Sequence, residues 1–159
     1  MINFTIDGTD RLLTRIEAYR KASDNAVLTA VKQTALAIEK TAKLRLRGML
    51  GSMKHIGIGA FLWKSIYNRS TGKKAEYIVG TPVEYAPYIE FGTGDLVFTN
   101  FSFDAQAREV ASHYKGRGLR KVNIRGDSFL NYAAVEQQPK LEQRIIDEMN
   151  KANANTWLK

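Results

Sequence analysis

The chain has 159 residues, enough for one domain whose core needs no disulfide or metal to hold it together. Its apolar content of 44% is ordinary for a globular protein, and the absence of cysteine excludes disulfide frameworks, thiolate nucleophiles and cysteine-ligated metal sites. A net charge of +8 indicates an anionic neighbour.

The N-terminal third predicts a strand followed by helix. Residues 2–6 place isoleucine or phenylalanine at every second position, which is typical of a half-buried strand, and no secretory signal is expected there. Residues 9–10 can cap a first helix, and Ser23-Asp24 is typical of a break or a new cap. A longer helix is predicted over residues 25–47, about 35 Å in length. Small side chains on its flanks predict close packing of another element: Ala30, Ala35 and Ala37.

The middle of the chain predicts a loop and a hairpin. Four glycines between residues 48 and 59 are typical of a mobile loop. Residues 61–69 and 74–81 then predict two strands, joined by a turn at residues 70–73.

A short helix and a long excursion are predicted next. Residues 86–91 favour the helix, because Pro87 suits a first helical turn and Gly92 suits a C-terminal exit. Residues 95–118 have weak periodicity and dense positive charge, which predicts a basic, flexible excursion with a helix in part of it, between residues 104 and 114.

The last third predicts a strand and then a helix. Residues 119–125 can return as a strand, and apolar residues recur every four positions over 141–149, in a helix that Pro139 starts or kinks. The whole order predicts an α+β fold in a single domain of residues 1–159. We expect an antiparallel sheet of about four strands, packed by a long N-terminal helix and a C-terminal helix. No run is apolar enough to span a bilayer, so we expect a soluble, intracellular protein with no membrane partner.

Motifs for catalysis are weak. The two histidines have no metal-ligand spacing, and Glu84 and Glu90 lie six positions apart across a proline, which fixes no geometry for a carboxylate pair. No serine sits in a nucleophile elbow, and residues 57–59 and 71–74 lack the further glycines of dinucleotide or phosphate loops. We therefore expect a protein that is not an enzyme, with no catalytic residue, metal or cofactor.

Two groups of cations stand out. The first can contact phosphates or a protein partner, with Tyr114 among them to stack on a base, or can be the charge of a solvated loop. Its members are Arg108, Lys115, Arg117, Arg120, Lys121 and Arg125. The second, within residues 40–54, is explained by the preference of cations for helix C-termini.

Glu90 lies in the stretch VGTPVEYAPYIEFGTG, residues 79–94, between Ile89 and Phe91. A buried carboxylate is costly unless it is paired or hydrogen-bonded. Three interpretations are open: Glu90 faces water, accepts backbone N–H groups from the turn at residues 92–94, or pairs with a cation of another subunit.

This stretch resembles the hallmark of the tail-completion proteins in the neck of long-tailed bacteriophages, also called head–tail joining or minor tail protein Z-like proteins. Members carry Val-Gly-Thr, Tyr-Ala and Glu-Phe-Gly-Thr blocks at this spacing, which match residues 79–81, 85–86 and 90–93. GAFLWKSI at residues 59–66 resembles the family's Gly-x-Leu-x-x-Ser-Ile strand. Residues 128–149 are similar to its closing segment, a Pro-Phe-Leu opening followed by a long polar helix.

The chain departs from the family pattern in three places. Ser128 stands where proline is usual, Pro139 interrupts a helix that is normally continuous, and the excursion at residues 95–118 is long.

The resemblance implies a structural virion protein without enzymatic activity. Such proteins form a ring, expected to be a hexamer in the virion, and let a finished tail join a DNA-filled head. The implied partners are head-closure or connector proteins and tail-terminator or tail-tube proteins, with possible non-specific contact to passing DNA. The implied location is the neck of the virion, after synthesis in the host cytoplasm. The alternatives are a tail terminator and, in a different class, a basic nucleic-acid-binding module.

Under this resemblance the residues around Glu90 are assigned to a structural corner and a ring interface. The glycines turn the chain after the short helix, two aromatic rings pack the corner down, and Glu90 fixes it. The assigned residues are Tyr85, Ala86, Glu90, Phe91, Gly92 and Thr93.

Overall fold

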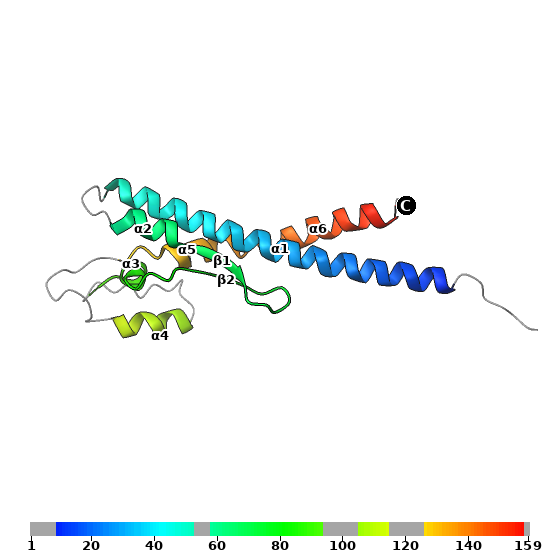
Figure 1. Ribbon diagram of the computed structural model, residues 1–159, viewed down its shortest axis with the longest axis horizontal. Helices are drawn as coiled ribbons and strands as arrows, with labels where there is room; N and C mark the ends of the chain where they lie inside the picture. Colours follow the sequence, from blue (N-terminus) through cyan, green and yellow to red (C-terminus); the bar gives the residue numbers. More distant parts are fainter. Residues whose placement is uncertain (1–8, 53–57, 94–104, 115–125, 158–159) are drawn as a thin grey trace, which may run out of the picture.

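The computed structural model describes residues 9–52, 58–93, 105–114 and 126–157. Its elements, in chain order, are α1 (Thr9–Ser52), α2 (Ile58–Ser65), β1 (Tyr67–Ser70), β2 (Tyr77–Gly80), α3 (Ala86–Phe91), α4 (Ala105–Tyr114), α5 (Phe129–Gln137) and α6 (Lys140–Trp157). The long helix α1 runs along the molecule, and the other elements are arranged beside it (Figure 1). The fold therefore mixes helices with one small sheet.

Helix α1 is continuous over 44 residues, which corresponds to about 66 Å. The predicted break at Ser23-Asp24 is wrong. The Asp24 carboxylate accepts a hydrogen bond from Lys74 Nζ at 2.7 Å, and it is therefore engaged with the hairpin. Just beyond it, Ala26 and Ala30 are buried, so packing holds the helix together through this point.

Parts of the loop predicted over residues 48–59 are helical instead. Helix α1 continues to Ser52, and α2 already begins at Ile58. Gly48 is exposed inside the helix, where glycine costs only about 1 kcal/mol relative to alanine. The adjacent core residue Leu46 is 3% exposed, so tertiary packing overrides this local preference.

The predicted hairpin is confirmed, but its first strand is mostly helix. Strands β1 and β2 pair antiparallel, with Tyr67 opposite Gly80 and Ser70 opposite Tyr77. Most of the strand predicted over residues 61–69 forms α2. Leu62 of α2 and Ile66 directly after it are both buried in the core, so tertiary contacts, and not the local pattern alone, decide the conformation here.

The prediction of about four strands is therefore corrected to a two-stranded sheet in the part of the chain that the structure describes. The other two predicted strands, at residues 2–6 and 119–125, lie outside the described residues. None of the described helices is both long and apolar enough to cross a membrane.

The remaining helices follow the predictions more closely. Helix α3 is the predicted short helix, and Gly92 follows it with a positive φ of 93° that glycine adopts without strain. Helix α4 is the helix expected within the excursion, whose other residues lie outside those described. Pro139 stands between α5 and α6 and directly precedes Lys140, the first residue of α6, where a residue without a backbone N–H is tolerated.

The core has two parts along α1. One joins the C-terminal half of α1 to α2, α3 and α5; its buried side chains are Ala42, Leu46, Leu62, Ile66, Ala86, Phe129 and Ala133. In the other, α6 packs on the middle of α1. Ala30 and Ala35 of α1 are both buried, as their small size predicted. Arg144 of α6 donates to Thr34 Oγ1 at 2.9 Å and so fixes the register of the two helices.

Candidate functional site

Glu90 closes the N-terminus of a helix that begins 39 positions later in the chain. Its side chain is 6% exposed. Oε2 accepts the backbone N–H of Leu130 at 2.9 Å, and Oε1 accepts that of Asn131 at 2.9 Å. These donors belong to the first turn of α5, where backbone N–H groups have no partner within the helix. Glu90 therefore acts as a cap supplied from another element.

The local cap of α5 does not supply these bonds. Ser128 occupies the N-cap position in a left-handed conformation, with a φ of 54°, and its side chain makes no capping hydrogen bond. A negative group at a helix N-terminus also interacts favourably with the helix dipole. The Glu90 carboxylate therefore caps α5 in place of the Ser128 hydroxyl.

The structure tests two of the three interpretations of Glu90. The water-facing one is wrong because the side chain is buried. The interpretation as an acceptor of backbone N–H groups is correct in kind, and the donors that the structure shows are Leu130 and Asn131 of α5. Pairing of Glu90 with a cation of another subunit stays a prediction.

Two backbone hydrogen bonds run from the segment before α5 to the end of α3. Asp127 N donates to Ile89 O at 2.8 Å, and Ser128 N donates to Glu90 O at 2.9 Å, so the last carbonyls of α3 are satisfied. Gly126 lies directly against this helix end: a Cβ there would be 2.4 Å from the carbonyl carbon of Phe91. Glycine is required at residue 126 because the two backbones approach so closely.

Arg45 ties this corner to α1. Its Nε lies 3.0 Å from Asp127 Oδ2, and its guanidinium also donates to the Asp127 backbone oxygen at 3.1 Å. The same guanidinium lies 4.0 Å from the centre of the Tyr132 ring, in a cation–π arrangement. A single side chain of α1 therefore contacts both the segment before α5 and the face of α5 itself.

Burial raises the pKa of the Glu90 carboxyl group above its ordinary value. The backbone N–H groups of Asn131 and Leu130 oppose this shift, nearby Asp127 adds to it, and Arg45 opposes it. A carboxyl group with a raised pKa can be an acid–base group in an enzyme. Here its oxygens bind backbone donors, so the geometry is that of a structural carboxylate.

The six residues assigned to the corner come together in space. Ala86 is buried in the main core, and Tyr85, at the N-cap of α3, packs against that core. Thr93 is 5% exposed beside the buried Gly92, and the backbone of Phe91 lies against Gly126.

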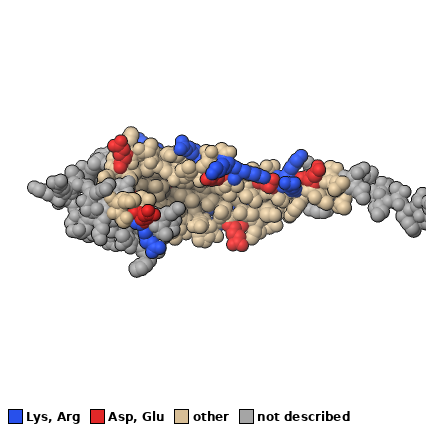
Figure 2. All heavy atoms as spheres, turned by 90° about the horizontal axis from the view of Figure 1, so that it is seen from below, with Lys and Arg blue, Asp and Glu red and all other residues tan. Residues whose placement is uncertain are grey.

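Only one of the six residues of the predicted basic cluster lies in the part of the chain that the structure describes. Arg108 is exposed on α4. The other five members, Lys115, Arg117, Arg120, Lys121 and Arg125, lie outside the described residues. On the face drawn in Figure 2, basic and acidic side chains lie close together, and uncharged atoms cover most of the described surface.

The explanation of the second basic group by the helix dipole is wrong, since α1 extends to Ser52 and has no basic residue in its last turn. Lys54 lies outside the described residues, and three members of the group, Lys43, Arg45 and Arg47, have specific neighbours. Lys43 pairs with Glu39, and Arg47 lies 5.2 Å from the centre of the Trp63 ring.

Sequence reasoning missed Arg45, Gly126 and Asp127 as parts of the corner. Gly126-Asp127-Ser128 directly precedes an apolar helix, which is a recognisable turn and helix-start signal and could have revealed this joint. Nothing in the sequence connects Arg45 to Asp127, 82 positions away.

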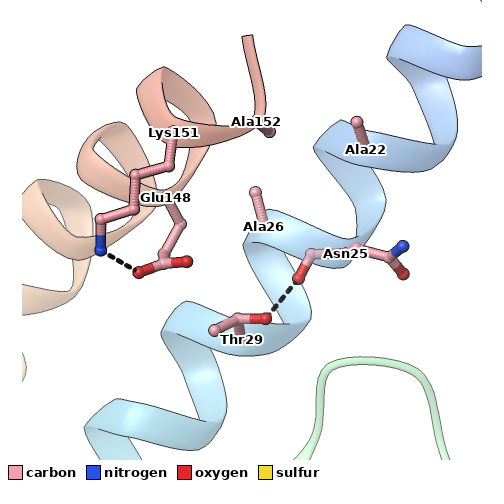
Figure 3. A pocket seen from close by; sticks show the side chains of 7 residues that line it. All are labelled: Ala22, Asn25, Ala26, Thr29, Glu148, Lys151 and Ala152. Carbon is pink, nitrogen blue, oxygen red and sulfur yellow. Dashed lines mark hydrogen bonds and ion pairs between the residues drawn. The ribbon is translucent and has the colours of Figure 1, made fainter. Parts of the chain in front are cut away.

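A hollow of about 340 Å³ lies between α1 and α6. Figure 3 shows small side chains on both sides of it, Ala22 and Ala26 from α1 and Ala152 from α6. Its polar groups are engaged with each other: Glu148 binds Lys151 at 2.7 Å, and the Thr29 hydroxyl donates to the backbone of Asn25 at 2.8 Å. This hollow follows from the small side chains where α6 crosses α1.

Within the described residues, no group of three or more histidine, aspartate or glutamate side chains is placed to hold a metal ion. No family model, no curated protein and no solved structure matches this chain.

Proposed function

We propose that the protein is a structural component of a long-tailed bacteriophage neck, a tail-completion protein that forms a ring and joins the finished tail to the DNA-filled head. The proposal rests on the sequence resemblance. One structural observation supports it: the separate blocks that carry the resemblance meet in one place.

Specific apolar residues from three of these blocks pack together. Leu62 and Ile66 of the first block, Ala86 of the corner and Phe129 of the closing segment are buried in one core cluster. The polar members meet as well, since the Ser65 and Thr81 hydroxyls lie 2.6 Å apart. Residues that are shared for a common fold are expected to pack against one another.

The blocks also supply the corner. Glu90 of the Glu-Phe-Gly-Thr block caps the helix that carries the Phe-Leu pair of the closing segment, through Leu130 N. The motif carboxylate is thus used to hold two motif segments together. Such a use suits a protein that acts through its shape and its contacts.

The experiment is a deletion of the gene in the phage that encodes it, followed by electron microscopy of the particles. We expect DNA-filled heads and complete tails that are not joined. Adding the purified wild-type protein to the lysate should restore joined, infective particles. Tails of irregular length would identify a tail terminator instead, and empty heads or absent tails would contradict both assignments.

A further inference from the structure

The outward side of α1 carries leucines where a helix surface in contact only with water carries polar side chains. Leu36 and Leu44 lie on the side turned away from the buried residues of this helix, and they are 47% and 56% exposed. Lys40 is exposed between them, about one turn from each. Lys32 and Arg47 are exposed at the two ends of the same side. These five residues form the basic face of α1.

The two lysines of this basic face have no carboxylate partner. Lys32 and Lys40 make no ion pair with any residue that the structure describes. Glu39 is the only acidic residue of α1 after Asp24, and its carboxylate is bound by Lys43. The basic face therefore combines unpaired positive charge with exposed apolar side chains, and such a surface suits a partner that is both acidic and apolar.

Helix α6 presents an outward face of the opposite charge. Ile146 is 44% exposed there, and Glu142, Gln143 and Asp147 are exposed around it. Glu142 makes no ion pair with a described residue, and Asp147 accepts a hydrogen bond from Gln143 at 2.9 Å. The cations of α6 are engaged elsewhere, in ion pairs with glutamates or, for Arg144, in a hydrogen bond to α1. Residues 142, 143, 146 and 147 form the acidic face of α6.

The spacing of charged and apolar residues matches between the two faces. Lys40 lies four positions from Leu36 and four from Leu44. Glu142 likewise lies four positions from Ile146. An apolar contact between Ile146 and either leucine therefore brings Glu142 next to Lys40, in antiparallel helices for one leucine and in parallel helices for the other. Complementary charges beside an apolar contact select a partner and fix its register.

We propose that the acidic face of α6 in one copy binds the basic face of α1 in a second copy. The two faces cannot meet within one molecule, because α6 already packs on α1 through its opposite side. The two surfaces differ, so the contact repeats from copy to copy and closes into a ring or extends into a chain. One helix face against another is a small interface, and we therefore expect association that depends strongly on protein concentration.

Charge reversal tests this contact. The association constant of the full-length protein is measured by sedimentation equilibrium at low ionic strength for Lys40→Glu, Glu142→Lys and the double variant. Each single change places like charges face to face and should weaken association about tenfold or more. The double variant restores opposite charges and should return to within about threefold of the wild type. A mixture of the two single variants should form a pair that neither forms alone.

Net charge does not explain the expected result. Lys40→Glu lowers the positive net charge of the chain, which by general repulsion alone would favour association, so a loss of association is specific to the contact. Lys21→Glu and Glu84→Lys make the same charge changes at exposed positions outside both faces. These two controls should stay within about twofold of the wild type, and all variants should melt like it.

A wild type that stays monomeric at millimolar concentration would overturn the inference. So would single variants that associate like the wild type, or a loss that the double variant does not recover. If instead the wild type bound a DNA oligonucleotide and did not self-associate, and Lys40→Glu alone abolished that binding, the basic face would be a nucleic-acid surface and the inference would be wrong.

This inference names contact surfaces for the proposed ring but does not rest on the neck assignment. Association lost in Lys40→Glu and recovered in the double variant, in a protein whose deletion leaves heads and tails joined, would retain the inference and reject the function. Unjoined particles, from a protein that does not self-associate, would do the opposite.

Discussion

Glu90 and Leu130 stand 40 positions apart in the chain and are joined by a 2.9 Å hydrogen bond from the Leu130 backbone N–H to the Glu90 carboxylate. The other carboxylate oxygen holds the next N–H, that of Asn131. This paired arrangement makes one buried side chain the cap of α5. It also means that the two oxygens of residue 90 are both needed, which gives the position a clear mutational signature.

Replacing Glu90 should lower the free energy of unfolding in a graded way. Glu90→Gln keeps one acceptor and turns an NH₂ group toward the second backbone donor, so a loss of about 1–3 kcal/mol is expected. Glu90→Leu leaves both donors unpaired and should cost about 2–5 kcal/mol. Urea titrations measure both. Glu84→Gln, at an exposed position in the same segment, is the control and should change little. Equal stability of all three variants would show that Glu90 does not hold the corner.

The pH dependence of Glu90 should have the opposite sign to that of a salt-bridged carboxylate. Its pKa is raised in the folded protein, mainly by burial. The contribution of the group to stability is therefore full below the pKa of the unfolded chain, about 4.3, and is lost as pH rises through the raised folded value.

The measurement is the difference in unfolding free energy between wild type and Glu90→Gln, from pH 4 to pH 8. We expect the advantage of the wild type to shrink as pH rises. An advantage that grows with pH would mean that the backbone hydrogen bonds outweigh burial and lower the pKa of Glu90.

Gly126→Ala should be strongly destabilising. The new Cβ would lie 2.4 Å from Phe91 C, 2.6 Å from Gly92 N and 2.7 Å from Glu90 O, all backbone atoms. Since these atoms can move only by disturbing α3, we expect a loss of about 3 kcal/mol, the upper part of the range for overpacking.

Gly48→Ala is the matched control for this change. A Cβ at residue 48 meets nothing within 4 Å, and the position is inside α1. Alanine should therefore stabilise the protein by about 0.5–1 kcal/mol. Thermal melts of the two variants should shift in opposite directions, and a neutral Gly126→Ala would refute the close approach of the two backbones.

Local signals predicted the parts of this fold whose structure depends on nearby residues. Pro87 and Gly92 bracket α3, because proline suits a first helical turn and glycine an exit with positive φ. The hairpin turn at residues 70–73 was predictable for similar reasons. Elements that tertiary contacts decide were not: α2 is helical through its contact with the core, and α1 continues through Ser23-Asp24 because of α6 and the hairpin.

In the candidate site, too, the features set by nearby residues were predictable and those set by tertiary contacts were not. The unusual position of Glu90 within an apolar run was visible in the sequence, and so was its need for hydrogen-bond donors. The identity of those donors was not, because Leu130 and Asn131 become neighbours of Glu90 only when α5 folds back against α3.

The last prediction concerns the fork formed by Arg45. Its guanidinium binds the Asp127 carboxylate through Nε and a terminal nitrogen and stacks on Tyr132, but the side chain is 33% exposed, so solvent weakens the pairing. Arg45→Ala should cost about 1–2 kcal/mol of unfolding free energy, and Arg45→Lys should recover less than half of it, because an ammonium group cannot reproduce the planar fork or the stacking. A double-mutant cycle with Asp127→Asn should give a coupling energy of about 1 kcal/mol.

Lys140→Ala, which breaks an exposed pair with Glu136, is the control and should cost under about 0.5 kcal/mol. If Arg45→Lys were as stable as the wild type, the charge alone would account for the contact, and the fork geometry at Asp127 would have no energetic role.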